Sequence, residues 1–102
     1  MNNKKKIDIY VDIDFRELIP FFFEDTQNDI KSIRLSLSKN NYEDIARIGH
    51  SLKGTGGSYG FHFLTDAGAA LEREAKNKNK DAIQEWLYMI THYLDKVNVL
   101  FK

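Results

Sequence analysis

Residues 45–60 read IARIGHSLKGTGGSYG, and this stretch combines the pattern of an amphipathic helix with an unusual density of glycine. Ile45, Ile48 and Leu52 recur at intervals of three and four residues, which places their side chains on one side of a helix. Each glycine inside a helix costs about 1 kcal/mol relative to alanine. The stretch nevertheless holds Gly49, Gly54, Gly56 and Gly57 before Tyr59. It therefore predicts a helix in which some requirement other than helix stability retains glycine.

The preceding segment, from about Phe15 to Lys39, is also predicted to be helical. Its apolar face is formed by residues three and four apart, namely Ile19, Phe22, Phe23, Thr26, Ile30, Ile33 and Leu37. Asp14 and Glu17 have the spacing of a capping box. Pro20 lies within the first two turns, so we expect either a short helix that ends there or a kinked helix. Of the aromatic residues 21–23, one must face solvent, where a partner can contact it.

Two more helices are expected after the glycine-rich stretch, and Asn41 is a suitable N-cap for the helix that contains it. One runs from about His62 to Lys76, and the other from about Asp81 to Phe101, each with apolar residues at helical spacing. Four amphipathic helices with short connections bury their apolar faces most simply against one another. We therefore expect an all-α fold, a four-helix up-down-up-down bundle over residues 14–102.

The first 13 residues have a different pattern. Apolar Ile7, Ile9 and Val11 alternate with Asp8, Tyr10 and Asp12, which is the period of an extended strand. The rest of the sequence shows no evident second strand to pair with it. We therefore expect residues 1–13 to form an extended N-terminal arm that lies on the bundle.

The composition argues against several classes of function. The 102 residues carry 15 Lys plus Arg and 15 Asp plus Glu, whereas nucleic-acid-binding proteins usually have a basic excess. The absence of cysteine excludes disulfides, thiolate metal sites and a cysteine nucleophile, and the histidines lack zinc-site spacing, so no metal site is expected. No apolar run reaches the ~18–20 residues of a membrane helix, and no signal peptide is evident. We expect a cytoplasmic protein that binds neither nucleic acid nor membrane.

His50 is the leading candidate for a functional residue. On the predicted helix it lies roughly 140–150° from the centre of the apolar face, toward solvent. Lys53, Gly54 and Gly57 follow it by three, four and seven residues and share its side of the helix. A large partner can therefore approach the imidazole over bare backbone. Since no carboxylate stands three or four residues from His50, the surface suits an anion.

The residue types indicate one kind of chemistry. A neutral imidazole is a nucleophile at cellular pH without a separate base. If it accepts a phosphoryl group, it gains about two negative charges. The ammonium group of Lys53 is close enough in sequence to offset part of that charge.

The stretch from His50 to Gly60 resembles the signature of histidine-containing phosphotransfer (HPt) domains. In that signature His-x-Leu-Lys-Gly is followed, after five residues, by Gly, and each fixed position is filled here. The resemblance implies a four-helix bundle that carries phosphohistidine, without binding ATP or phosphorylating itself. It implies that His50 is the phosphoacceptor, through Nε2, and that Lys53 stabilises the phosphoryl group. It also implies that Gly54 and Gly57 give a partner access and that Gly60 shapes the turn after the helix.

The resemblance also implies the partners. His50 would accept a phosphoryl group from the aspartyl phosphate of a response-regulator receiver domain and pass it to another receiver, with a hybrid sensor kinase as a further candidate partner. No cofactor is expected on this chain, because Mg²⁺ belongs to the receiver's site. We expect the protein to act as a monomer.

Two alternatives remain open. One is the dimerisation and phosphoacceptor domain of a sensor histidine kinase. Such domains carry an acidic residue directly after the histidine and a proline shortly beyond, whereas here Ser51 follows His50 and no proline comes later. The other is a non-catalytic helical interaction domain, which would have no use for the glycines. His62 and His92 lack comparable neighbours and are not expected to act.

Overall fold

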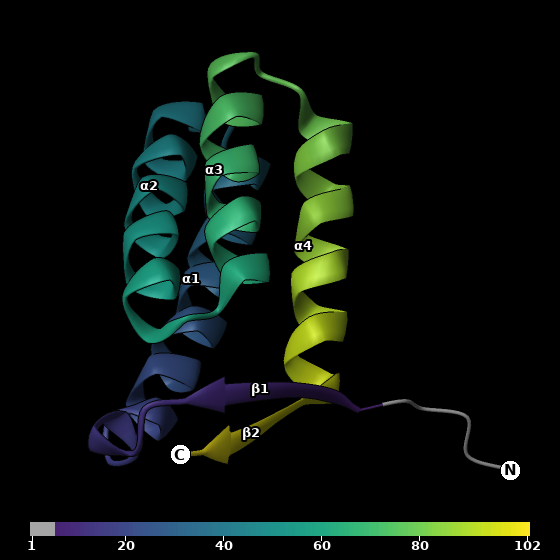
Figure 1. The fold of residues 1–102 in the computed structure, drawn as a ribbon. Coiled ribbons are helices and arrows are strands. Elements are labelled where there is room, and N and C mark those ends of the chain that lie inside the picture. Colours follow the sequence, from purple (N-terminus) through teal and green to yellow (C-terminus); the bar gives the residue numbers. More distant parts are fainter. Residues whose placement is uncertain (1–5) are drawn as a thin grey trace, which may run out of the picture.

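Residues 6–102 are described by a computed structural model, in which they form four α-helices and a two-stranded sheet. The elements, in chain order, are β1 (Ile7–Val11), the 3-10 helix η1 (Ile13–Phe15), α1 (Ile19–Ser38), α2 (Tyr42–Tyr59), α3 (His62–Lys76), α4 (Lys80–Lys96) and β2 (Val97–Phe101). Successive helices run in opposite directions and pack side by side (Figure 1). The predicted all-α, up-down-up-down bundle is confirmed. None of the helices in this part of the chain is long and apolar enough to cross a membrane.

Capping side chains account for where two of the elements begin. The Asn41 side chain accepts a hydrogen bond from the backbone N–H of Asp44 at 3.1 Å and caps α2, as predicted. The predicted capping box of Asp14 and Glu17 is wrong, because both residues lie before the start of α1. Asp12 instead accepts a hydrogen bond from the Asp14 N–H at 2.9 Å and caps η1. The chain thus makes a separate short turn before the first long helix.

Pro20 lies at the beginning of α1 rather than inside it. The helix starts at Ile19, so the ring occupies the first turn, where a missing N–H costs no helical hydrogen bond. Of the two predicted alternatives, the short preceding helix is present as η1, but it ends at Phe15 and not at Pro20. The expected start of the long helix near Phe15 is therefore four residues too early.

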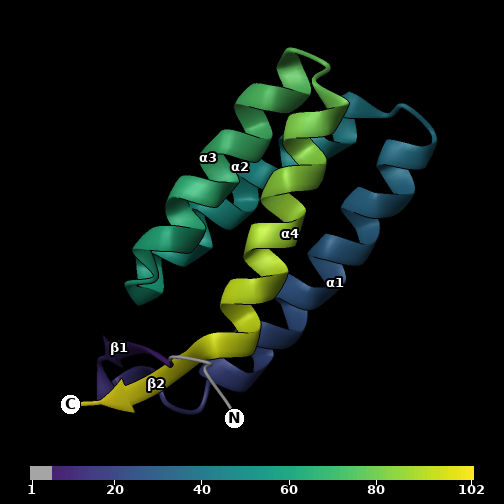
Figure 2. The same cartoon turned by 90° about the vertical axis from the view of Figure 1, so that its right-hand side faces the viewer.

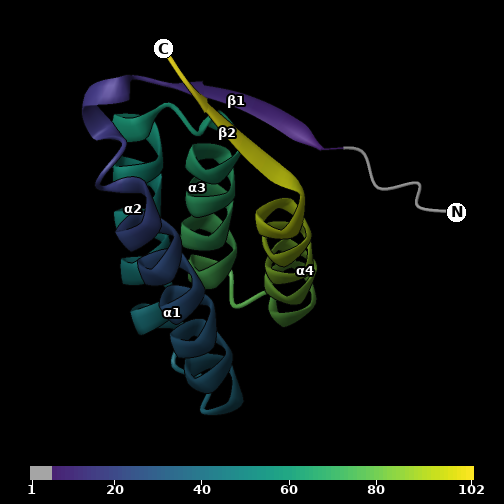
Figure 3. The same cartoon turned by 90° about the horizontal axis from the view of Figure 1, so that it is seen from below.

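The two strands pair in parallel across one end of the bundle (Figures 1 and 3). Their register sets Ile7 opposite Val97 and continues to Val11 opposite Phe101. A side-chain hydrogen bond of 3.1 Å from Asn98 Nδ2 to Asp8 Oδ1 ties the strands together on their outer side. The sheet joins the beginning of the described chain to its end.

Two expectations about the ends of the chain are wrong. The last helix ends at Lys96 instead of Phe101, and the expected arm has a partner strand, residues 97–101. Val97 and Phe101 fit a helical face as well as a strand, so local periodicity does not choose between the two. Pairing with a segment about 90 residues away makes the choice. Residues 1–5 of the expected arm lie outside the described residues.

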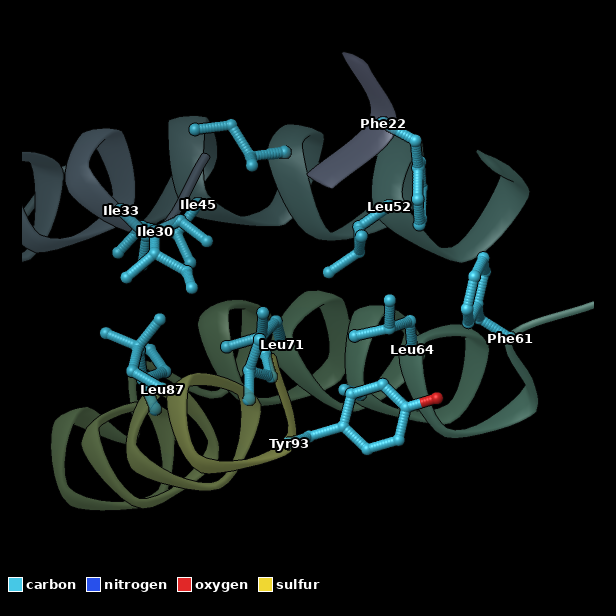
Figure 4. Packing of buried hydrophobic residues seen from close by; sticks show 14 of the residues in the cluster. Phe22, Ile30, Ile33, Ile45, Leu52, Phe61, Leu64, Leu71, Leu87 and Tyr93 are labelled. Carbon is cyan, nitrogen blue, oxygen red and sulfur yellow. The ribbon is translucent and has the colours of Figure 1, made fainter. Parts of the chain in front are cut away.

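The inner faces of the four helices form one hydrophobic core (Figure 4). Phe61, which is fully buried between α2 and α3, stacks on Phe22 of α1 with ring centroids 5.2 Å apart. Val11 of β1 is also buried, so the sheet closes this end of the core. Burial of each such side chain contributes about 1.5–3 kcal/mol, and the core holds the four helices in fixed relative positions.

Glycine lets α2 and α3 pack more closely than any other pair of helices. A Cβ added to Gly68 of α3 would lie 2.5 Å from the backbone nitrogen of Lys53 and 2.6 Å from the carbonyl oxygen of Gly49. A Cβ on Gly49 would lie 2.8 Å from the backbone nitrogen of Glu72, and Gly56 is similarly close to Thr65. The helix contact therefore explains Gly49 and Gly56, which are buried. Gly54 and Gly57 are exposed and remain to be explained.

Candidate functional site

His50 lies near the middle of α2 and faces solvent, as predicted. Its side chain is 66% exposed, whereas Ile48 and Leu52, two residues to either side, are buried in the core. The helix geometry inferred from the sequence is therefore correct at this position. A partner can reach the imidazole without any rearrangement of the bundle.

Glu72 of α3 lies directly beside His50, although it was not among the predicted site residues. Its two carboxylate oxygens lie 3.2 and 3.3 Å from His50 Nδ1. The two residues are 22 positions apart, and the close packing of α2 against α3 brings them together. Gly68 and Glu72 are one turn apart on α3, and a glycine at that spacing, facing the glycines of α2, is the signal that would have indicated the contact.

Two lysines flank the same carboxylate. Lys53 Nζ lies 3.4 Å from Glu72 Oε1, and Lys76 Nζ lies 3.5 Å from Glu72 Oε2. Lys53 was predicted to be near His50, whereas Lys76, which is one turn beyond Glu72 on α3, was not. With two ammonium groups and one carboxylate, the group around the imidazole has a net charge of +1. We refer to His50, Lys53, Glu72 and Lys76 as the His50 cluster.

The ionised carboxylate of Glu72 determines which nitrogen of the His50 ring carries a proton in their contact. The hydrogen bond with His50 is the main cause that holds the pKa of Glu72 below its usual value, and the nearby charges act in the same direction. An ionised carboxylate only accepts hydrogen bonds, so Nδ1 of His50 must carry the proton in this contact. The neutral ring then has its lone pair on Nε2. Nε2 is therefore the ring nitrogen that is left without a proton in this contact.

The three predicted access glycines have different surroundings. Gly54, one turn from His50, is exposed, and a Cβ placed there would meet nothing within 4 Å. Gly57 is exposed too, and its Cβ would make only an ordinary contact of 3.4 Å with Thr65 Oγ1. Gly60 ends α2 in the left-handed conformation, with φ of 86°, which glycine adopts without strain. Gly54 and Gly57 thus leave bare surface beside the imidazole, and Gly60 shapes the turn.

The other histidines lie outside the His50 cluster. His92 stacks on Tyr88 with centroids 5.5 Å apart on the exposed side of α4, and His62 is exposed at the start of α3. Within residues 6–102, no group of three or more His, Asp and Glu side chains is arranged to hold a metal ion. Among the three histidines, His50 is the one with a carboxylate and two lysines grouped beside it.

Comparison with known families finds a match that covers most of the chain. The family model for the Hpt domain matches residues 17–98, a range that includes all four helices and the His50 cluster. No curated protein and no solved structure matches the chain. Because the match covers most of the sequence, this chain belongs to the Hpt domain family, the histidine phosphotransfer domains.

Proposed function

We propose that His50 carries the phosphoryl group, accepting it from the aspartyl phosphate of one receiver domain and passing it to another. A phosphotransfer role in two-component phosphorelays, and interaction with receiver domains, follow from the family. The contact of 3.2 Å between His50 Nδ1 and Glu72 supports the choice of this histidine, because it leaves Nε2 unprotonated on an exposed ring.

The transfer step needs no base to deprotonate the nucleophile. The Nε2 lone pair attacks phosphorus, and an N–P bond forms while the bond from phosphorus to the aspartate oxygen breaks. The receiver's aspartate leaves as a carboxylate, and the proton stays on Nδ1. The ring gains positive charge as the bond forms, and the Glu72 carboxylate, already in place, stabilises that charge. Transfer to the next receiver is the reverse of this step.

The two lysines of the cluster prepare the site for the product. A phosphoryl group brings about two negative charges, and the cluster has a net charge of +1 before it arrives. Lys53 approaches Glu72 from α2, and Lys76 approaches it from the next turn of α3. Both lysine side chains are partly exposed. We propose that they turn from Glu72 toward the phosphoryl group, so that its charge is partly neutralised.

The exposed glycines define where the receiver approaches. Gly54 and Gly57 lie one and two turns from His50 and present backbone instead of side chains. We propose that the chain is a cytoplasmic phosphocarrier without ATP binding or self-phosphorylation, and that it needs no cofactor of its own. The Mg²⁺ used in the transfer is then bound by the receiver, where it neutralises the transferring group.

Phosphoryl uptake from a labelled receiver tests the proposal. Receiver domains from the same organism, phosphorylated on aspartate, are mixed with the wild-type chain, with His50→Gln and with the control His92→Gln, which removes another exposed histidine. We expect acid-labile, alkali-stable label on the wild type and on the control and none on His50→Gln, with unchanged helicity. Label on His50→Gln would mean that another residue accepts the phosphoryl group.

The same assay separates the two alternatives. A non-catalytic interaction domain would bind receivers without taking up label. A sensor-kinase phosphoacceptor domain would take its label from ATP when a kinase catalytic domain is added, and not from a phosphorylated receiver. Uptake from the receiver alone, confined to His50, supports the phosphocarrier.

A further inference from the structure

The outer face of α1 exposes two large apolar side chains on the side away from the core. Phe21 is 67% exposed and Leu35 is 57% exposed, whereas neighbouring Phe22 and Ile33 are buried. Phe21 and Leu35 are 14 residues apart, or about four turns at 3.6 residues per turn, so they lie on the same side of the helix. Figure 2 shows α1 at the outer edge of the bundle, and no other element of the described residues lies beyond it.

The charges on this face change sign along the helix. Glu24 lies in the N-terminal half of α1 and Lys31 in the C-terminal half, and both are exposed. None of the ion pairs within residues 6–102 involves either side chain. At 100° per residue, both lie on the same flank of the stripe that connects Phe21 to Leu35. The face is therefore acidic toward one end and basic toward the other.

This arrangement is nearly symmetric about Asn28. Phe21 lies seven residues before Asn28 and Leu35 seven after it, and Glu24 and Lys31 lie four before and three after. If two copies of α1 pack antiparallel across a twofold axis at Asn28, Phe21 of each copy meets Leu35 of the other. Glu24 of each copy then faces Lys31 of the other. A twofold dimer requires this kind of self-complementary surface, in which each contact occurs twice.

We propose that the outer face of α1 is a homodimer interface, occupied by the same face of a second copy of this chain. Charge complementarity indicates that the occupant of this face is a second copy of the chain. When two α1 helices pack antiparallel, apolar residues meet apolar residues and acidic residues meet basic ones, and no other arrangement of the two helices gives both matches. The exposed apolar residues of α4, Tyr88 and Met89, lie among the acidic Asp81 and Glu85 and offer no such match. A single helix contact about 30 Å long is small for a permanent interface, so the dimer forms reversibly as the concentration rises.

The interface is separate from the phosphotransfer site. His50 turns toward α3, where it contacts Glu72, whereas α1 packs against α2 and α4. Both imidazoles of the dimer therefore stay open to receiver domains. The proposal replaces the expected monomer and does not depend on which residue carries the phosphoryl group.

Sedimentation equilibrium between about 1 µM and 1 mM tests the interface. We expect the wild type to shift from monomer to dimer over this range. Leu35→Asp should weaken the dimer at least tenfold, and Tyr88→Asp, which removes an exposed aromatic ring from α4, should not. A wild type that stays monomeric at 1 mM would overturn the proposal.

A charge exchange tests the antiparallel register. Lys31→Glu alone sets acidic side chains opposite each other twice and should weaken the dimer, as should Glu24→Lys. The double variant Glu24→Lys/Lys31→Glu restores both pairs and should dimerise like the wild type. Failure of the double variant to recover would contradict this register, and circular dichroism controls for loss of helix.

A single cysteine locates the twofold axis. The natural sequence has no cysteine, so Asn28→Cys provides the only thiol, and in the proposed dimer it lies opposite its own copy. A short bifunctional thiol cross-linker should convert this variant to covalent dimer far faster than Gln84→Cys, an exposed position on α4. Equal cross-linking of the two variants would count against the interface.

Discussion

At the scale of single residues, the carboxylate of Glu72 determines the orientation of the His50 imidazole. Glu72 lies 3.2 Å from Nδ1 of His50, so the ring is oriented and Nε2 is left without a proton, as the proposed nucleophile requires. The carboxylate also forms ion pairs with Lys53 and Lys76, the two lysines proposed to stabilise the phosphoryl group. Each of these roles predicts a different result when the residue is changed.

Replacing Glu72 should alter the tautomer of His50 and slow its phosphorylation. Glu72→Ala removes the acceptor at Nδ1, so the proton divides between the two ring nitrogens, and we expect transfer to slow by about tenfold or more. Glu72→Gln keeps an acceptor oxygen and should retain more activity. Imidazole ¹⁵N NMR measures the tautomer directly. An unchanged Nδ1–H tautomer in Glu72→Ala would exclude this positioning role.

Removing either lysine should shorten the lifetime of the phosphorylated form. Two unit charges 4 Å apart in water interact by about 1 kcal/mol, and a tenfold change corresponds to about 1.4 kcal/mol. We therefore expect Lys53→Ala and Lys76→Ala each to shorten the lifetime of the phosphorylated form by up to about fivefold, with a larger effect in the double variant. Lys80→Ala, exposed at the start of α4, is the control. Loss of label over time, with no receiver present, gives the lifetimes.

A bulky side chain at Gly54 should obstruct the receiver. Because a Cβ at Gly54 meets nothing within 4 Å, Gly54→Leu fits the fold and should leave the melting temperature unchanged or slightly raised. Transfer from the phosphorylated receiver should slow, and Gly54→Ala should have a smaller effect. Stopped-flow or quench-flow transfer rates measure both, and equal rates in all three proteins would contradict the access role.

At the scale of elements, the contact between α2 and α3 creates the site. Gly49, Gly56 and Gly68 allow backbone to approach backbone, and this approach brings Glu72 within reach of His50. The close packing of α2 against α3 therefore offsets the loss of helix stability that glycine causes in α2. The same contact places Lys53 of α2 and Lys76 of α3 near the same carboxylate, that of Glu72.

Gly68→Ala tests whether this contact supports the fold. The new Cβ would lie 2.5 Å from the Lys53 backbone nitrogen, and backbone cannot turn aside as a flexible side chain does. We expect a loss of about 1–3 kcal/mol in the free energy of unfolding. Gly54→Ala, the matched control on the open side of α2, should gain up to about 1 kcal/mol. Urea denaturation measures both variants, and equal stabilities would contradict the packing argument.

At the scale of the whole molecule, carboxylates link stability to pH. The hydrogen bond from Ser36 is the largest cause that holds the pKa of Asp44 below its usual value, and the hydrogen bond from Arg47 is the second. The Ser36 hydrogen bond also joins α1 to α2. The pKa of Glu72 is lowered by His50. Asp29 has the opposite shift, since burial and then Asp25 raise its pKa.

The sign of the pH dependence follows from these shifts. A carboxyl whose pKa is lower in the folded state stabilises the fold at neutral pH, and that contribution is lost as the pH falls through its folded pKa. We expect the free energy of unfolding to decrease below about pH 4.5, the ordinary value for a glutamate. Asp44→Asn should be less stable at pH 7 and less sensitive to acid, as measured by urea denaturation at each pH. An acid dependence equal to that of the wild type would remove Asp44 from this account.

Periodicity along the chain was enough to predict the four helices, their order and the exposed position of His50. Lys53, Gly54 and Gly57 were also placed correctly beside it, because residues within two turns of one helix have relative positions set by the helix itself. The capping role of Asn41 was equally local, whereas the turn at Gly60 was expected only from the resemblance to the family.

Features that join distant segments required the folded molecule. Glu72 reaches the imidazole only because α3 packs on α2, and it brings its neighbour Lys76 to the same site. Residues 97–101 become a strand only because β1 lies beside them. The roles of Gly49 and Gly68 likewise appear only when the two backbones meet. Such contacts depend on how several apolar faces are buried together, and the pattern within any one segment is compatible with more than one neighbour.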